Sequence, residues 1–295
     1  MTKVAVTATD DRIYGVNKSF ELLGINPVKG KRVVLKPNFN TADPPPASTH
    51  MDTFRQILIK IQEMGAKTIT VAERCGPANT EKAFKQKGLH ELADEFGFLI
   101  VNLETVSRDE WVMKNPKGNH WKDGFLFAKV YDEAECVIET CCLKTHMYGG
   151  HFTLSMKNAT ALVPRVGYKY MTELHSSPNQ RKMIAEINAA YNWDIIIMDG
   201  VLAFVDGGPM EGTLKEANVF VAGTDKIAID AVGVALLRML GTTPEVSRGP
   251  IFKQEQIARA VELGIGISSF QDIEFVTDSA QSEQLVERIK REFEE

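Results

Sequence analysis

The sequence predicts an α/β protein with a mostly parallel β-sheet and helices on both faces of that sheet. Short runs of β-branched residues alternate with longer amphipathic segments along nearly the whole chain, a pattern that is typical of right-handed βαβ units. Several of the short runs are continuously apolar, as are strands that a parallel sheet buries on both faces.

Eight of the short runs are predicted strands because they are rich in β-branched residues and are bounded by polar or glycine-containing segments. In chain order they cover residues 4–7, 32–35, 68–71, 98–103, 136–140, 195–198, 219–222 and 273–276.

The clearest predicted helix covers residues 52–64, where Phe54, Ile57, Leu58 and Ile61 fall on one apolar stripe. Gly65 follows that stripe and is a common type of helix stop. The same periodicity predicts helices over residues 81–96, 180–191, 227–240, 254–263 and 282–295.

The organisation into domains has two interpretations. The stretch 149–178 is rich in glycine, serine and proline and is too long for a simple connector. One interpretation therefore places an N-terminal α/β lobe over 1–180, with the site segment at 136–178, and a C-terminal α/β lobe over 181–295. A cleft would then lie between the two lobes. The other interpretation is a single continuous sheet.

Composition excludes several classes of protein. The net charge is −5, with 34 Lys and Arg against 39 Asp and Glu, which argues against a nucleic-acid or anionic-membrane partner. No stretch approaches the roughly 20 apolar residues of a membrane span, and the first residues lack the apolar core of a signal peptide. The predicted location is the cytoplasm. The four cysteines fit neither a disulfide framework nor a zinc pattern, so we expect reduced thiols.

Polar residues follow several predicted strands, where ligands bind in open α/β sheets. These residues are Lys36, Asn38, Glu73, Arg74, Lys144, His146, Asp199, Thr224 and Asp225. Each position alone is explained equally well by a polar loop. Their recurrence predicts a shared rim that binds a small anionic molecule.

The densest polar segment runs from residue 141 to residue 158. If its strand continues to His146, the period of two places Lys144 and His146 on the same face. The pair Gly149 and Gly150 permits close approach of the backbone. Further along the segment, Lys157 and Asn158 offer a cation beside an amide, a combination suited to a carboxylate, a phosphate or a carbonyl oxygen.

Three of the six histidines, His146, His151 and His175, fall in or near this segment. One of them could act as a general acid or base, and the three together could hold a divalent metal. The alternative is that they cap turns or bond to the backbone. No carboxylate stands beside them at the spacing of a metal ligand.

Acidic residues gather later in the chain. Asp199, Asp206 and Glu211 surround a glycine-rich turn that could orient a lysine or hold a cation, or could be a solvated turn. Asp230 interrupts an apolar helical stripe, so we expect it to be paired. A reactive role for Cys141 would require a lowered pKa.

Common cofactor and nucleophile motifs are missing. There is no G-x-G-x-x-G segment after a strand and no P-loop, which weakens interpretations based on NAD or ATP. There is also no G-x-S-x-G elbow, which disfavours a serine hydrolase.

The segments VVLKPNFN, CLKTHMYGGHFTLSMKNATALVP, IIIMDGV, GGPMEGT and GTDKIAIDAVG, together with His175, resemble the uncharacterised family called domain of unknown function 362. The resemblance spans most of residues 1–240. It implies no settled activity, and the ferredoxin-like module of some members is missing from the sequence.

A fainter similarity is to the N-terminal part of nickel-dependent lactate racemases, whose order of motifs matches His146, the glycine pair, Lys157 and His175. In those enzymes the lysine tethers a nickel-bearing nucleotide, and histidines bind nickel or move protons. The glycines of this chain lie several residues before Lys157. The similarity therefore implies the position of the site and not the cofactor.

The leading hypothesis is an enzyme that acts on a small anionic or carbonyl substrate by Lys/His acid–base or metal-assisted chemistry, of a racemase-like, isomerase-like or redox-associated class. Catalysis is assigned to Lys157, His146 and His175. Substrate binding is assigned to Lys36, Asn38, Lys144, Asn158, Asp199, Asp206 and Glu211.

The competing hypothesis is a non-catalytic protein that binds a metal, a cofactor or a redox partner. A third is a decayed site in a subunit of a complex. The sequence leaves the oligomeric state open.

Overall fold

The computed structural model describes residues 1–294, and nine strands of this part of the chain form one sheet. Its members are β1 (Thr2–Ala8), β2 (Arg32–Lys36), β3 (Thr68–Glu73), β4 (Leu99–Asn102), β7 (Cys136–His146), β8 (His151–Phe152), β9 (Ile195–Gly207), β10 (Gly212–Gly223) and β11 (Ile273–Thr277). Their order across the sheet is β11-β1-β10-β9-β7-β2-β3-β4, with β8 beside β7. Only β8 and β10 of these nine run against the others, so the predicted mostly parallel sheet is confirmed.

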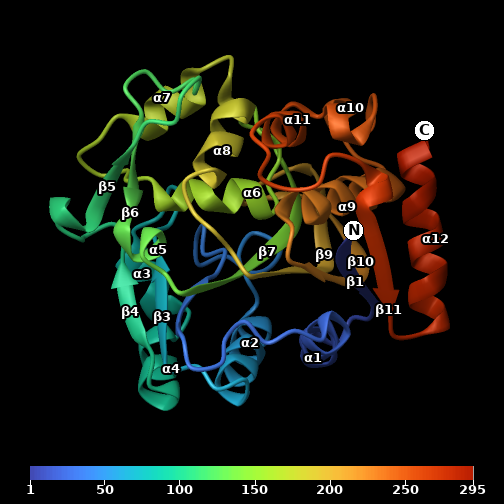
Figure 1. Ribbon diagram of the computed structural model, residues 1–295, viewed down its shortest axis with the longest axis horizontal. Coiled ribbons are helices and arrows are strands. Elements are labelled where there is room, and N and C mark those ends of the chain that lie inside the picture. Colours follow the sequence, from blue (N-terminus) through green and yellow to red (C-terminus); the bar gives the residue numbers. More distant parts are fainter. Residues whose placement is uncertain (295) are drawn as a thin grey trace.

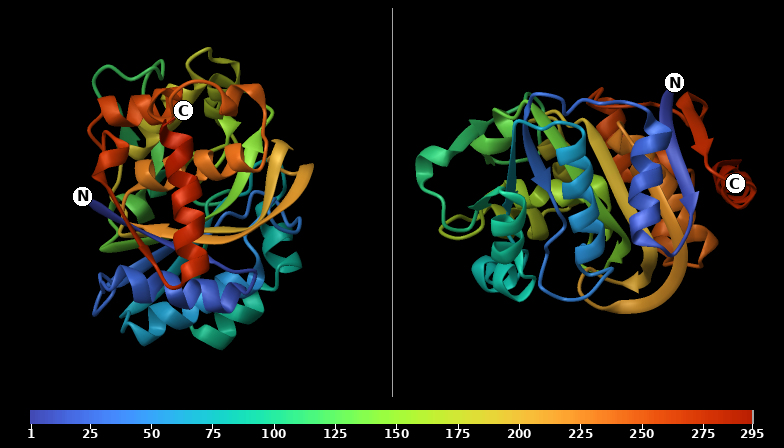
Figure 2. Two further views of the ribbon diagram at one scale, coloured as in Figure 1. Left: turned by 90° about the vertical axis from the view of Figure 1, so that its right-hand side faces the viewer. Right: turned by 90° about the horizontal axis from the view of Figure 1, so that it is seen from below.

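Helices cover both faces of the sheet (Figures 1 and 2). The first face carries α1 (Arg12–Leu23), α2 (Met51–Glu63), α3 (Thr80–Gln86) and α4 (Leu89–Phe96). The second carries α6 (Ser155–Asn158), α8 (Gln180–Asn188), α9 (Lys226–Met239) and α11 (Glu255–Glu262). Each layer encloses its own apolar core, one around Phe54 and Ile57 and the other around Met198 and Val232.

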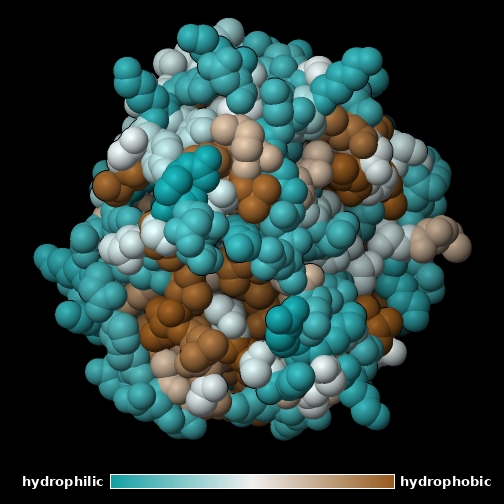
Figure 3. Space-filling view, turned by 60° about the vertical axis from the view of Figure 1, so that its left-hand side comes forward, coloured by the Kyte–Doolittle hydropathy of each residue, from teal (hydrophilic) through white to brown (hydrophobic). Residues whose placement is uncertain are grey.

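Smaller elements complete the fold at the sides of the sheet. A separate two-stranded sheet pairs β5 (Trp111–Lys114) with β6 (Phe125–Ala128). Short helices follow as α5 (Lys129–Asp132), α7 (Tyr170–Ser176) and α10 (Pro244–Ser247), and the long helix α12 (Ala280–Glu294) closes the described chain. Around β4, apolar residues gather on the surface amid hydrophilic ones (Figure 3). Among the described residues, no helix has the length and apolar character required to cross a membrane.

All eight predicted strands are present, and three of them are much longer than predicted. The strand expected over 136–140 continues to His146, the one over 195–198 continues to Gly207, and the one over 219–222 starts at Gly212. Polar residues end the apolar runs, but pairing with neighbouring strands extends the ladders beyond them. This extension fixes which side chains can reach a common site.

The helix predicted over 81–96 is wrong as a single helix. The chain ends α3 after Gln86 and begins α4 at Leu89, because Gly88 adopts a left-handed conformation with φ of 66°. A residue in that conformation interrupts the helical hydrogen bonds. The other predicted helices are confirmed to within a few residues, and Glu295, the last residue of the predicted terminal helix, lies outside the described residues.

Two lobes are not confirmed. β1 comes from the start of the chain but pairs with β10 and β11, while β7 pairs with β9. Strands from both sides of residue 180 therefore belong to one hydrogen-bonded sheet. The boundary near residue 180, with lobes over 1–180 and 181–295, stays a prediction.

Helix α2 offers a direct test of the first layer. Ile57 is fully buried in the core beneath this helix, whereas Ile13 of α1 is 52% exposed. We expect Ile57→Ala to lower the free energy of unfolding by about 2–5 kcal/mol, because it leaves a cavity. The exposed control Ile13→Ala should change it by less than about 0.5 kcal/mol. Urea titrations followed by circular dichroism measure both values, and equal losses would contradict the described packing.

Candidate functional site

A cavity of about 650 Å³ opens where β2, β3 and β7 end. Most of its polar lining comes from these strand ends and from α6. The lining residues are Asn38, Asn40, Glu73, Arg74, Gly76, Pro77, Lys144, His146, Tyr148, Thr153, Lys157, Asn158, Thr160, Ala161, Arg165, Met171, His175, Pro209 and Met210. The predicted rim at the carboxyl ends of the strands therefore exists over β2, β3 and β7.

Six of the residues assigned a role from the sequence line this one cavity. They are Asn38, Lys144, His146, Lys157, Asn158 and His175. Strand β7 does continue to His146, so Lys144 and His146 lie on the same face as expected. Lys36 lies behind the lining and is fully buried.

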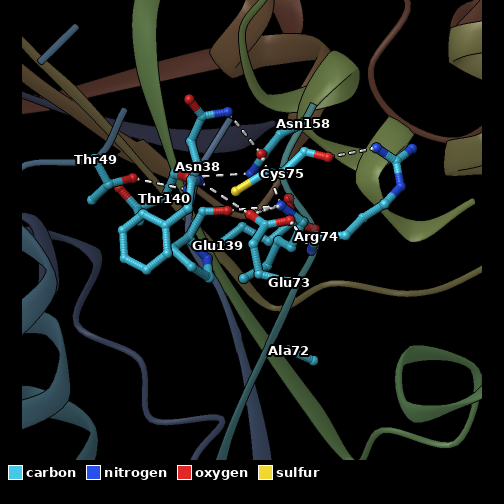
Figure 4. Close-up of polar contacts among 12 residues, drawn as sticks. Asn38, Thr49, Ala72, Glu73, Arg74, Cys75, Glu139, Thr140 and Asn158 are labelled. Carbon is cyan, nitrogen blue, oxygen red and sulfur yellow. Dashed lines mark hydrogen bonds and ion pairs between the residues drawn. The ribbon is translucent and has the colours of Figure 1, made fainter. Parts of the chain in front are cut away.

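A buried polar network forms the base of the cavity (Figure 4). The Lys36 ammonium donates to Glu73 Oε2 at 2.7 Å and to Asn158 Oδ1 at 3.0 Å. Asn38 Nδ2 donates to the same Asn158 oxygen at 3.0 Å, and Asn158 Nδ2 donates to the backbone oxygen of Thr140. The network joins β2, β3 and β7 to α6 and fixes the position of α6 over the sheet.

Glu73 was placed on the predicted rim from the sequence but was given no binding or catalytic role. Burial raises its pKa, and the neighbouring Lys36 opposes that effect. Its two oxygens also accept the backbone N–H groups of Phe39 and Arg74. The position of Glu73 directly after a buried strand was the available signal, but its buried partner could not be read from the sequence.

Lys144 lies in the cavity wall and is almost completely buried. Its ammonium donates to Asn38 Oδ1 at 2.9 Å and to the Ala47 carbonyl oxygen at 2.6 Å. Neither acceptor carries a charge. Burial lowers the pKa of Lys144 to about 8, so it retains most of its charge at neutral pH.

Lys157 is 7% exposed, and its ammonium has no hydrogen-bond or ion-pair partner among residues 1–294. Burial, together with the charges of Lys144 and Arg74, lowers its pKa to about 7. A lysine of this kind exchanges a proton readily at neutral pH. Lys157 is therefore available to bind a ligand anion or to act on it.

The two histidines of the cavity adopt opposite tautomers. His146 Nδ1 accepts the Gly150 N–H at 3.3 Å, so its neutral ring carries the proton on Nε2. His175 Nδ1 donates to the Met171 carbonyl oxygen at 2.7 Å, which leaves a lone pair on Nε2. The ring centroids lie 6.5 Å apart.

Both imidazoles favour the neutral form. Burial lowers the pKa of His146 far below its ordinary value, and the charge of Lys157 adds to this effect. Burial also lowers the pKa of His175, which stands at the exposed mouth of the cavity. At neutral pH the cavity thus holds one imidazole N–H donor and one imidazole lone pair.

Gly150 permits the approach of His146 to Lys157. A Cβ atom at this position would lie 2.8 Å from His146 Nδ1 and 3.0 Å from Lys157 Cε. Any side chain would have to displace one of these two residues. The predicted close approach of the backbone at the glycine pair is confirmed here.

Asp230 holds the start of α6. It accepts the Ser155 N–H at 2.8 Å, the Ser155 hydroxyl at 2.5 Å and the Met156 N–H at 3.2 Å. Burial raises the pKa of Asp230 to about 6. The expected partner of this buried acid is therefore the short helix that carries Lys157 and Asn158.

Four predicted residues do not line the cavity, namely His151, Asp199, Asp206 and Glu211. Asp199 was expected just beyond a strand end, but β9 continues through it, and it accepts hydrogen bonds from Arg12 and Thr53. Asp206 accepts from the backbone of Gly207, and Glu211 is exposed. Substrate contacts by the three acids stay predictions.

The predicted metal triad of His146, His151 and His175 is not assembled. No group of three or more His, Cys, Asp or Glu residues within 1–294 could hold a metal ion. His151 lies outside the cavity lining, although it pairs with His146 in the β7–β8 ladder. The side chains of the site therefore do not fit a metal ion bound by this chain alone.

The cysteines contribute no reactive thiolate to the site. Burial raises the pKa of Cys141 well above its ordinary value and that of Cys142 to about 11. Both side chains are buried in strand β7. The lowered pKa that a reactive Cys141 requires is not present.

Comparisons with known proteins agree with the fold. The model of the family described as "Domain of unknown function (DUF362)" matches residues 33–235. A curated relative, "Thylakoid-associated protein sll1697" from Synechocystis sp., is 25% identical over 214 residues, which are 71% of this chain and 64% of that protein. The chain thus spans less than two thirds of the length of this relative.

A solved structure with a similar fold is the lactate racemase apoprotein from Thermoanaerobacterium thermosaccharolyticum. The TM-score is 0.50 at 14% identity, and the similarity covers 79% of this chain and 57% of that one. At this level of identity the similarity concerns the fold alone.

The lowered pKa of Lys157 predicts how stability depends on pH. Because the unfolded chain holds this proton more tightly, the free energy of unfolding should rise with pH between about pH 7 and pH 10. Without the lysine, in Lys157→Met, the rise should be less steep by up to about 1.4 kcal/mol per pH unit. Urea titrations at several pH values measure the slopes, with Lys253→Met as the control that removes an exposed lysine. Equal slopes in the wild type and Lys157→Met would contradict the lowered pKa.

Proposed function

This chain belongs to the family described as domain of unknown function 362, and we propose that it is an enzyme that moves protons on a small anionic carbonyl compound. The observation that carries the proposal is the pair of neutral histidines with opposite tautomers beside an unpartnered lysine. Removal of a proton next to a carbonyl group needs a base for the proton and a hydrogen-bond donor for the carbonyl oxygen, and this pair supplies one of each.

The roles follow from the atoms that face the cavity. His175 Nε2 has a free lone pair and accepts a proton from the carbon next to a carbonyl or carboxylate group. His146 Nε2 carries a proton and donates a hydrogen bond to the carbonyl oxygen of the substrate, and the proton held by His175 then returns to carbon. The 6.5 Å between the rings leaves room for a substrate atom to interact with both.

Positive charge in the cavity stabilises the negatively charged intermediate of the proposed proton transfer. Removal of a proton next to a carbonyl group places negative charge on the carbonyl oxygen. Lys144 and Lys157 stand in a buried wall, where low dielectric strengthens their attraction for that charge. Asn38 and Lys36 hold Lys144 and Asn158 in place and act as positioning residues.

The reaction class that fits these roles is racemisation or isomerisation. Both reactions remove a proton from carbon and return it, and neither requires an external oxidant. The structural neighbour is named a lactate racemase, which supports the same class. Metal-assisted chemistry has less support, since the described residues contain no metal-binding group of three ligands.

A second candidate is a protein that holds a small anionic cofactor without turning it over. The cavity of about 650 Å³ favours it, because this volume is that of sites for drug-sized ligands and exceeds the needs of a three-carbon acid. Native mass spectrometry of the purified protein separates the candidates, since a retained cofactor adds a fixed mass.

The place of the protein in the cell stays a prediction. The sequence favours the cytoplasm, and the name of the curated relative places that protein at thylakoids. The proposed reaction requires neither location.

Deuterium exchange tests the proposed proton transfer. In D2O the enzyme should replace the carbon-bound hydrogen of a suitable 2-hydroxy or 2-oxo acid, and proton NMR would record the loss of its signal. We expect His175→Gln and His146→Gln to slow the exchange by about 10²–10⁴-fold, as removal of an acid or base does.

The control is His90→Gln, which changes a partly exposed histidine of α4 outside the cavity. It should exchange at the rate of the wild type. If an active acid is found and both cavity variants retain full exchange, the assigned roles are wrong. If none of a panel of such acids exchanges, the proton-transfer function itself is contradicted.

A further inference from the structure

The turn between β9 and β10 supplies an apolar part of the cavity wall. Pro209 and Met210 of this turn both line the cavity. They belong to the segment GGPMEGT, in which the sequence pointed to the acid Glu211, a residue that does not line the cavity. The proposed proton transfer gives no role to the apolar residues of this turn.

Close backbone contacts hold this turn against the end of β7. Met147 N–H donates to the Gly208 carbonyl oxygen at 3.2 Å. A Cβ atom on Gly208 would lie 2.1 Å from the Thr145 carbonyl oxygen, so glycine is required for this approach. The two residues that follow Gly208 are therefore placed in the cavity wall at the carboxyl end of β7.

Tyr148 adds an aromatic side chain to the cavity wall near the same end of β7. It lines the cavity, and its ring packs edge-on against the ring of His146, with 5.7 Å between the centroids. The residue is 52% exposed. Large apolar side chains that stay exposed around a cavity are typical of ligand-binding surfaces.

The charged and apolar residues of the cavity differ in depth. Lys144 is 1% exposed and Lys157 is 7% exposed, so the ammonium groups lie at the closed end. Tyr148 and His175 are exposed and Met210 is half-buried, so these residues lie nearer the mouth. A ligand that places an anion at the lysines would extend the rest of its structure toward the mouth.

The size of the cavity leaves room for such an extension. Its volume of about 650 Å³ is that of a site for a drug-sized ligand, well above the size of a three-carbon acid. An apolar group bound against the exposed side chains at the mouth would remove apolar surface from water on both sides of the contact. This removal strengthens binding.

We propose that the substrate is an acid with a bulky apolar substituent, and that Tyr148, Pro209 and Met210 bind this substituent. The anionic group lies toward Lys144 and Lys157, and the reacting carbon lies between the two histidines. The substrate class is a 2-oxo or 2-hydroxy acid with an aromatic or branched alkyl side chain. This inference rests on the proposed function, because it names the substrate class of the same cavity.

Calorimetric titration measures the preference for an apolar substituent. The probes are pyruvate, 4-methyl-2-oxopentanoate and phenylpyruvate, which share one head group and differ in the substituent. We expect at least one of the two larger acids to bind about tenfold or more tightly than pyruvate, because each buried methylene group adds affinity. Benzyl alcohol, which has the ring but no anionic group, should bind at least about tenfold more weakly than the preferred acid.

Variants locate the preference at the mouth of the cavity. Met210→Gln and Tyr148→Ser should each reduce the ratio of the two affinities, preferred acid over pyruvate, by about threefold to tenfold. The matched control Met113→Gln replaces an exposed methionine of β5 outside the cavity lining and should keep the wild-type ratio. Because Tyr148 is exposed, Tyr148→Ser carries the test if Met210→Gln fails to fold.

Four results would overturn the inference. They are equal affinity for the three acids, no binding by any of them, benzyl alcohol bound as tightly as the preferred acid, and a wild-type ratio in both cavity variants. Failure of the proposed function is seen separately. If the preferred acid binds but its carbon-bound hydrogen does not exchange in D2O, the apolar binding surface is confirmed and the proton transfer is contradicted.

Discussion

The ion pair between Lys36 and Glu73 lies at the base of the cavity and engages the only carboxylate among the described lining residues. No carboxylate is left to neutralise Lys144, Lys157 or Arg74, which all face the same enclosed space. The burial of Lys157, and then the repulsion from Lys144 and Arg74, explain why its pKa falls to about 7. The same surroundings disfavour a charged imidazole at His146. An anionic ligand would supply the missing negative charge, so ligand binding and proton chemistry depend on one electrostatic constraint.

The fold follows from local patterns that the sequence shows plainly. Short runs rich in β-branched residues marked all eight predicted strands, and a stripe that included Ile57 marked α2, because both patterns reflect burial against neighbours. Strand length was harder to predict. Lys144, Thr145 and His146 at the end of this strand are polar, and pairing with β9 and β8 keeps them in β7. Helix boundaries were hard to predict for a similar reason. The left-handed conformation of Gly88 breaks a segment whose apolar pattern is continuous.

The candidate site was predictable where its residues share one segment. Lys144 and His146 alternate on a strand, and Gly150 follows them closely, so the chain itself brings them near Lys157. Residues whose role depends on distant partners were harder to assign. Glu73 and Arg74 follow a strand like many polar residues, and their importance comes from Lys36 and from the carbonyl groups of residues 160–163. Asp199 was expected just beyond a strand end, but β9 continues past it.

The cavity keeps both histidines neutral and in opposite tautomers. Nitrogen NMR of the protein with ¹⁵N-labelled histidine measures this directly, since protonated and unprotonated ring nitrogens resonate at different frequencies. At neutral pH we expect His146 to carry its proton on Nε2 and His175 to carry its proton on Nδ1. On acidification His146 should stay neutral well below the ordinary histidine pKa of about 6.5. Two imidazoles that both take up a proton near that value, or that share one tautomer, would contradict the account.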